Sequence, residues 1–144
     1  MGVIEQERRP IGYWLKHLDR LIEEAFERTL SADGLARRHW QVLNTLSMGG
    51  KTNVDLAVAL QPFVGDDATA TEIVARDLVS RGWVRQLESS ELELTETGRS
   101  AHAAVLKRVT AIRQLLRRGI TDDEYVSVVA VLQRMASNLE SAGP

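Results

Sequence analysis

The sequence predicts a mainly α-helical protein with one small β-hairpin. Three observations predict this fold class. Apolar residues recur with helical spacing over most of the chain, the spacing changes to alternation at about residues 83–94, and glycines or capping residues stand at the expected helix ends. Four helices, the hairpin and two more helices follow in that order. Three short helices and a hairpin make a winged helix-turn-helix, here at about residues 35–99, with long helices before and after it.

The first predicted helix runs from about Pro10 to Leu30. Proline suits a helix start because its missing N–H would have no partner there. A heptad-like apolar stripe follows, made of Ile11, Leu15, Leu18, Ile22 and Ala25. So wide an apolar face must be covered, either by the rest of the chain or by a second copy.

Three shorter helices are expected in the middle of the chain. The first spans about residues 35–46 and ends at Met48-Gly49-Gly50; the second starts near Thr52, a good N-cap. Residues 62–65 are predicted to be a connector. The last of these three, the fourth helix of the chain, spans about residues 67–81, with Asp66 or Asp67 as its cap and Gly82 as its stop.

The hairpin is predicted from strands at residues 83–87 and 91–94 around the turn Glu88-Ser89-Ser90. Thr95 caps the long helix that follows, whose stripe is Ala101, Val105, Val109, Ile112 and Leu116. Gly119 interrupts it, and Thr121 with Glu124 forms a capping box for the last helix. That helix carries the stripe Tyr125, Val129, Leu132, Ala136 and Leu139.

Composition is that of an ordinary globular protein, with 44% hydrophobic and 26% charged residues among 144. One domain over residues 1–144 is expected. The absence of cysteine excludes thiolate metal sites. The polar start and the lack of a long apolar run predict a cytoplasmic protein without a membrane span. The net charge is -2, yet residues 97–121 hold six bases and no acid.

The long first, fifth and sixth helices are too apolar to stand alone. Packed against a second copy across a two-fold axis, they would bury their stripes. A homodimer is therefore expected, with residues 10–30 and 99–140 as its dimerisation helices.

Four short segments, in this order and spacing, make the chain resemble the multiple-antibiotic-resistance regulator (MarR) family. They are Trp40-Gln41-Val42-Leu43, Asp55-Leu56-Ala57, Leu78 with Arg81-Gly82-Trp83-Val84, and Leu94-Thr95-Glu96-Thr97-Gly98-Arg99. The resemblance implies a homodimer that binds a pseudo-palindromic operator on double-stranded DNA and is often released by a small aromatic ligand.

The candidate DNA contacts lie on three elements. The fourth helix is the one that enters the major groove in such folds, and it offers Thr69, Thr71 and Arg76. Lys51 and Asn53 can hold phosphate at the start of the third helix, and Arg99 after the hairpin. The alternative for the fourth helix is a solvated face with one ion pair between Glu72 and Arg76.

A ligand site for a small apolar or aromatic anion is also predicted. Trp14 and His17 share a helical face, and His39 and Trp40 can meet them if the second helix crosses the first. The alternative is that both tryptophans belong to the core, with the histidines at its edge.

No catalytic motif stands out. The histidines lack His-Glu-x-x-His spacing, and neither a Gly-x-Ser-x-Gly elbow nor a phosphate-binding glycine loop is present. The sequence predicts neither an enzyme nor a cofactor. The alternative to a DNA-binding regulator is a winged-helix dimer with weakened DNA binding that serves as a protein- or ligand-binding module, because the fourth helix and the hairpin turn are acidic.

Overall fold

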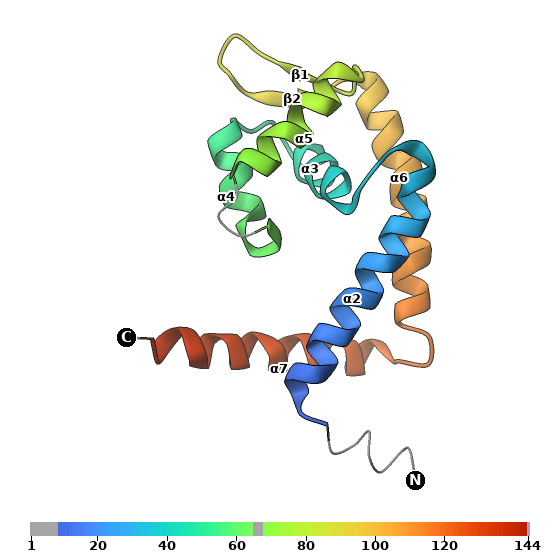
Figure 1. The fold of residues 1–144 in the computed structure, drawn as a ribbon, viewed down its shortest axis with the longest axis vertical. Coiled ribbons are helices and arrows are strands. Elements are labelled where there is room, and N and C mark those ends of the chain that lie inside the picture. The colour runs from blue at the N-terminus through green and yellow to red at the C-terminus, as the bar shows by residue number, and fades with distance from the viewer. Residues whose placement is uncertain (1–8, 65–67, 144) are drawn as a thin grey trace. The chain divides into compact units, whose positions relative to one another are not determined.

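The computed structural model describes residues 9–64 and 68–143 (Figure 1). Asp66 and Asp67, the predicted caps, lie outside the described residues. The elements are α2 (Ile11–Leu30), η1 (Ser31–Asp33), α3 (Arg37–Ser47), α4 (Asn53–Val64), α5 (Ala68–Ser80), β1 (Val84–Gln86), β2 (Leu92–Leu94), α6 (Glu96–Leu116) and α7 (Asp122–Ser141). This order confirms the predicted fold class. The chain divides into two compact units, residues 1–109 and 110–144.

One apolar core joins α3, α4, α5 and the hairpin. Its members are Val42, Leu43, Leu46, Leu56, Leu60, Val74, Ala75, Leu78, Val84, Leu92 and Leu94. Each helix contributes residues three or four apart, so each buries one stripe. Burial of these side chains is the main force that holds the three helices and the hairpin together.

Helix α4 is longer than the sequence predicted. Residues 62–64 were expected in a connector, but the helix continues to Val64 with Pro62 inside it. A proline breaks a helix because it removes one backbone hydrogen bond and crowds the preceding turn. Here it stands in the last turn, and the helix ends two residues later.

The junction between the hairpin and α6 explains why Thr95 and Gly98 stand in the segment Leu94-Thr95-Glu96-Thr97-Gly98-Arg99. The Thr95 hydroxyl donates to the Gly82 carbonyl at 2.6 Å and accepts from the Gly98 N–H at 3.0 Å, so Thr95 caps α6 as predicted. A Cβ on Gly98 would stand 1.9 Å from the carbonyl oxygen of Trp83. Only glycine therefore lets the start of α6 lie against the base of the hairpin.

Gly98→Ala should destabilise the fold by about 3 kcal/mol, because its methyl group would overlap backbone that the core holds in place. Denaturant unfolding measures this change. Gly12→Ala is the matched control: Gly12 is also helical, a Cβ added there would meet no atom within 4 Å, and the variant should shift stability by at most about 1 kcal/mol. Equal stability of the two variants would contradict the close approach at Gly98.

The second unit contains the end of α6 and the whole of α7. The predicted capping box of Thr121 and Glu124 is present, with hydrogen bonds of 3.1 and 2.9 Å. Arg117 pairs with Asp122 at 2.5 Å and lies 4.2 Å from the centre of the Tyr125 ring. These contacts fix the turn between the two helices.

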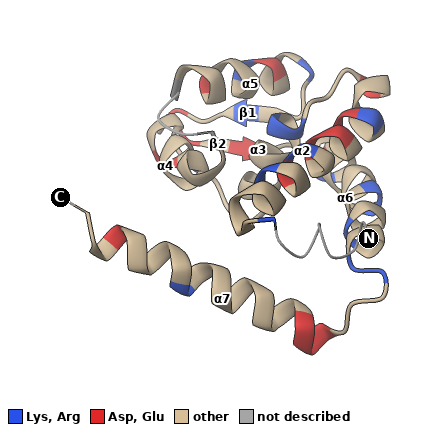
Figure 2. Ribbon diagram, turned by 60° about the horizontal axis from the view of Figure 1, so that its bottom comes forward, with Lys and Arg blue, Asp and Glu red and all other residues tan. Residues whose placement is uncertain are grey.

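Helix α7 buries none of its residues in the single chain. Figure 2 shows that most of its length is uncharged. Its exposed large apolar residues are Tyr125, Val126, Val128, Val129, Val131, Met135 and Leu139, and those of α2 are Ile11, Tyr13, Trp14, Leu15, Leu18 and Leu21. Among the described residues, no helix is long and apolar enough to cross a membrane.

Candidate nucleic-acid interface and ligand site

Helix α5 has one face toward the core and one toward solvent. We define its outer face as Thr69, Glu72, Ile73 and Arg76, which are spaced three or four residues apart and so lie together. Thr69 is exposed, Ile73 is 60% exposed, and the Arg76 side chain is 77% exposed. These residues are accessible to a ligand as large as a duplex.

Thr71 corrects the sequence prediction. It is only 1% exposed and faces the core with Val74, Ala75 and Leu78. Its hydroxyl is buried and has no hydrogen-bond partner among the described residues. A side chain so placed cannot contact a phosphate or a base edge, so the prediction was wrong for Thr71.

Arg76 forms the ion pair that the alternative interpretation expected. Its Nη2 lies 3.2 Å from Oε1 of Glu72, one turn away on the same helix. An exposed pair of this kind contributes only about 0.3–0.5 kcal/mol. A bidentate contact of arginine with guanine favours guanine over other bases by about 1–3 kcal/mol. The ion pair with Glu72 is weaker than this, so it would not keep Arg76 from contacting a base.

A hollow of about 260 Å³ lies where α5, the start of α4 and the hairpin meet. It is lined by Asn53, Glu72, Ala75, Arg76, Val79, Gln86 and Leu92. The structure thus brings together Asn53 and Arg76, which are 23 positions apart in the sequence. Gln86 was not predicted. Because it stands two residues after the buried Val84 on β1, alternation along the strand could have placed it beside α5.

Lys51 is attached to the hairpin. Its N–H donates to the Leu92 carbonyl at 3.0 Å, and its carbonyl accepts from the Leu92 N–H at 2.7 Å. The Thr52 hydroxyl accepts from the Asp55 N–H at 3.2 Å, which confirms Thr52 as the cap of α4. Lys51 and Asn53 therefore flank a helix N-terminus, where backbone N–H groups favour anions.

Arg99 stands exposed in the first turn of α6, just after the hairpin. The tip of the hairpin offers no basic side chain: residues 87–91 carry only Glu88 and Glu91 as charged groups. Arg85, the base nearest the tip, pairs with Glu93 across the strands at 2.6 Å. Cations therefore lie beside the hairpin and not at its tip.

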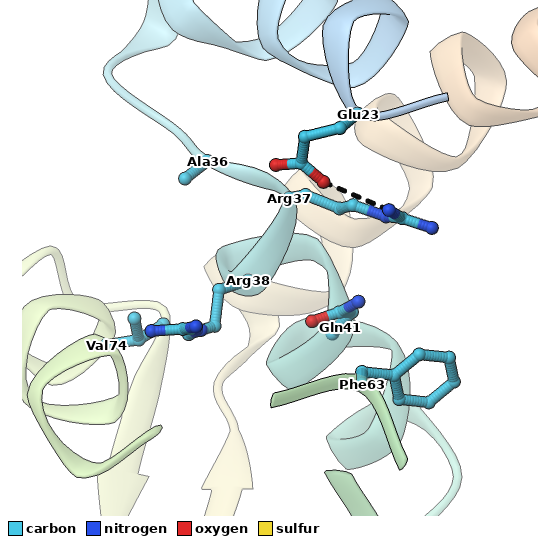
Figure 3. Close-up of a pocket in the computed structure, with 7 residues that line it drawn as sticks. All are labelled: Glu23, Ala36, Arg37, Arg38, Gln41, Phe63 and Val74. Atoms are coloured by element: carbon cyan, nitrogen blue, oxygen red, sulfur yellow. Dashed lines mark hydrogen bonds and ion pairs between the residues drawn. The ribbon is translucent and has the colours of Figure 1, made fainter. Parts of the chain in front are cut away.

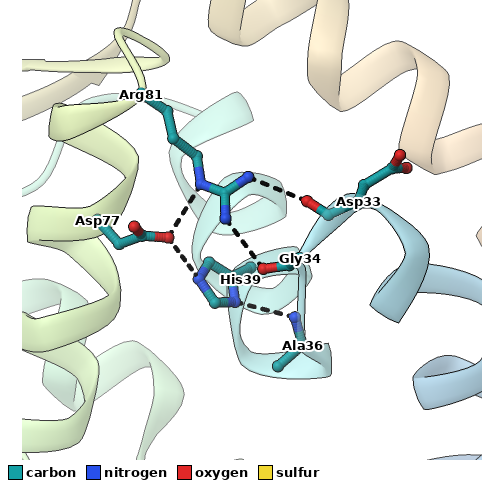
Figure 4. A network of polar contacts seen from close by, with 6 residues as sticks. All are labelled: Asp33, Gly34, Ala36, His39, Asp77 and Arg81. Atoms are coloured by element: carbon teal, nitrogen blue, oxygen red, sulfur yellow. Dashed lines mark hydrogen bonds and ion pairs between the residues drawn. The ribbon is translucent and has the colours of Figure 1, made fainter.

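A polar network joins α5 to the segment between α2 and α3 (Figure 4). His39 Nδ1 accepts from the Ala36 N–H at 3.0 Å, so Nε2 carries a proton and donates to Asp77 at 2.9 Å. Arg81 donates to Asp77 at 3.0 Å and to the carbonyls of Asp33 and Gly34 at 3.2 and 2.9 Å. Two hydrogen bonds from the Arg81 guanidinium thus tie the end of α5 to this segment, and a third joins Arg81 to Asp77 of α5 itself.

Two opposing effects act on the Asp77 carboxylate. Partial burial raises its pKa, but hydrogen bonds from His39 and Arg81, together with the charge of Arg81, lower the pKa further than burial raises it. The pKa therefore lies below its ordinary value of 3.8. Asp77 stays ionised at neutral pH and keeps both partners in place.

The four residues predicted to bind a ligand fall into separate groups. Trp14 and His17 both contact Tyr13, with ring centres 5.0 and 5.6 Å away. Trp40 is 5% exposed and stacks on His102 at 5.3 Å, while His39 belongs to the network described above. Helical spacing alone could not show which turn of α2 meets α3.

Two hollows lie beside the start of α3. One of about 260 Å³ is lined by Glu23, Ala36, Arg37, Arg38, Gln41, Phe63 and Val74 (Figure 3). The other, of about 340 Å³, is lined by Glu23, Glu27, Ser31, Gly34, Leu35, Ala36, Arg37 and His39. Arg37 is held by Glu23 at 3.0 Å, whereas Arg38 forms no ion pair with any described residue. Of the predicted ligand residues, His39 lines one of these hollows.

His102 should make stability depend on pH. Burial lowers its pKa below the ordinary value of 6.5, and its Nε2 donates to Asn44 at 3.1 Å. The unfolded chain therefore binds the proton more readily, and the free energy of unfolding should fall as pH drops below about 6.5. His102→Phe keeps a ring against Trp40 and should reduce this fall.

The measurement is denaturant unfolding at several pH values between about 7.5 and about 5, which bracket the ordinary pKa of histidine. Val58→Ala is the control, because it changes a non-titratable residue that is 67% exposed on α4, and it should retain the wild-type pH dependence. An unchanged slope in His102→Phe would show that another group carries the effect.

A helix-turn-helix pair followed by a two-stranded hairpin and flanked by long helices defines a winged-helix protein. Solved structures give the finer class. The chain is similar to transcriptional regulator PA3341, with 26% identity, a TM-score of 0.77 and coverage of 92% of this chain and 99% of that one. Several of the other similar solved structures are MarR or MarR family proteins, so the chain has the MarR-like winged-helix fold, and the resemblance found in the sequence is confirmed.

Two further similar structures were solved with ligands. The Mycobacterium tuberculosis MarR family protein Rv2887, in complex with DNA, is 21% identical with a TM-score of 0.70, and the match covers 88% of this chain and 98% of that one. CouR from Rhodococcus jostii RHA1, bound to p-coumaroyl-CoA, is 24% identical with a TM-score of 0.70, and the match covers 92% and 91%. No protein-family model and no curated protein sequence matches the chain.

Proposed function

We propose that this chain is a DNA-binding transcriptional regulator that acts as a homodimer on a pseudo-palindromic operator. The observation that carries the proposal is the surface shared by α5, the start of α4 and the hairpin. It places Arg76, Asn53 and Gln86 around one hollow, next to Lys51. The similar Rv2887, solved with DNA, supports this assignment.

Each residue has a distinct task in this proposal. Arg76, exposed on α5, donates to a guanine edge in the major groove, and Thr69 contacts the backbone or a base beside it. Lys51, Asn53 and Arg99 hold phosphates, which fixes the register of α5 in the groove.

Such a regulator acts where the DNA is, so the cytoplasm is the compartment we propose, and its action requires no catalysis.

The homodimer is proposed from unburied apolar surface. Helix α7 has no buried residue, and α2 exposes a row of large apolar side chains that includes Trp14, Leu15 and Leu18. A protein of this size gains most by covering such faces with the same faces of a second copy. Two-fold symmetry then presents two α5 helices, which is why the operator is expected to be an inverted repeat.

Leu18→Asp or Leu132→Asp should convert the dimer to monomer, because each buries a charge in the proposed interface. Sedimentation at micromolar concentration measures the change. Val58→Asp is the control: Val58 is 67% exposed on α4, outside the proposed interface, and the variant should sediment as the wild type does. A monomeric wild type would contradict the proposal.

Selection from a random duplex pool should enrich an inverted repeat. On that operator, Arg76→Ala should weaken binding by about 1–3 kcal/mol and relax specificity at one position per half-site. Lys51→Ala should weaken all sequences alike and reduce the salt slope of binding by about one. Titrations on the operator and a scrambled duplex at several salt concentrations measure both effects.

Ser89→Ala is the control, because Ser89 lies at the hairpin tip, which has no basic side chain. This variant should bind the operator as the wild type does. Equal affinity for both duplexes, unaffected by Arg76→Ala, would favour the second candidate function. That candidate is a winged-helix dimer that binds a protein or small ligand, and the acidic hairpin tip with Glu88 and Glu91 is the observation in its favour.

A small apolar or aromatic anion is the ligand we propose for regulation; the similar CouR was solved with p-coumaroyl-CoA bound. The four predicted residues do not form one site in this chain. The proposal therefore centres on the hollows beside α3, where His39 and Arg37 line one and Arg38 the other.

A further inference from the structure

Ile73 is exposed at the centre of the outer face of α5. It lies four residues after Thr69 and three before Arg76, and 60% of its surface is accessible. The core does not need it, because Val74, Ala75 and Leu78 already supply the buried stripe of this helix. An isoleucine left in water gains nothing from burial, so a group from outside the described chain would gain free energy by covering it.

The major groove offers one apolar group on its base edges, the C5-methyl group of thymine. Apart from the small C5–H of cytosine, the other edge groups are hydrogen-bond donors or acceptors, which an aliphatic side chain would desolvate without replacing. A helix that enters the groove with Ile73 in the middle of its contact face therefore gains most free energy over a thymine, where a methyl group is buried.

We infer that Ile73 is a specificity-determining residue that selects a thymine through its methyl group. This inference rests on the proposed function and adds a base preference to it. Ile73 precedes Arg76 by three residues, about 4.5 Å along the helix axis, and base pairs are spaced about 3.4 Å. The thymine therefore lies one or two base pairs from the guanine that Arg76 contacts, once in each half-site.

Replacing thymine by deoxyuridine tests this contact, because it removes the methyl group and leaves the base pairing intact. After selection of an operator, each thymine is replaced singly, and affinity is measured by fluorescence anisotropy at fixed salt. For the wild type, one thymine per half-site should show about a fourfold loss, the value for one buried methyl group. Replacing both should give about a sixteenfold loss, since the half-sites are well separated.

Ile73→Ala should bind thymine and deoxyuridine operators equally, whereas Ile73→Val should keep a reduced preference for thymine. Both variants should fold, because the side chain is exposed. Val58→Ala is the matched control: Val58 is 67% exposed on α4, and its variant should keep the full fourfold preference.

The outcomes separate the two proposals. Selection that enriches no sequence overturns the proposed function and this inference with it. Two outcomes with an enriched operator would overturn the role of Ile73 alone: no deoxyuridine position lowers affinity, or Ile73→Ala keeps the wild-type preference for thymine. In either case the proposed function as a DNA-binding regulator is unaffected.

Discussion

The burial of one stripe of α5 is the constraint on which the candidate interface depends. Thr71, Val74, Ala75 and Leu78 are spaced so that all four face the shared core. A helix repeats every 3.6 residues, so fixing this stripe inward turns Ile73 and Arg76 outward. The core therefore decides which side chains can meet DNA, and the contacts of Arg81 decide how the end of the helix is held.

Local chemistry made most of the fold predictable. Caps such as Thr95 and Thr121 act within four residues, and the hairpin follows from the alternation of apolar and polar residues. Both can therefore be predicted from the local sequence. The burial of Thr71 was missed because a polar residue stands in the buried stripe of α5. The end of α4 was missed because a proline in the last turn of a helix does not end the helix at once. The grouping of Trp14 with His39 failed since periodicity says nothing of which turns meet.

The net charge of -2 does not by itself set the potential that DNA meets, because that potential depends on where the charges lie. Many acids are already engaged: Asp77 with Arg81, Glu72 with Arg76, Glu93 with Arg85 and Asp33 with Arg108. Lys51 and Arg99, by contrast, form no ion pair with any described residue. The first turns of α4 and α6 also carry Asp55 and Glu96, so a phosphate at either helix start meets the sum of one cation, one acid and the backbone N–H groups there.

The hollow of about 340 Å³ beside α3, which we propose as a ligand site, shares residues with the contacts that hold α5. His39 lines the hollow of about 340 Å³ and also donates to Asp77 of α5, while Gly34 lines it and accepts from Arg81. A molecule that displaces either residue removes a contact that holds α5. Since coupling between two sites is reciprocal, DNA that fixes α5 must change the affinity of that molecule by the same factor. If the proposed ligand and operator both bind, the Asp77 network is the set of contacts through which one could affect the other.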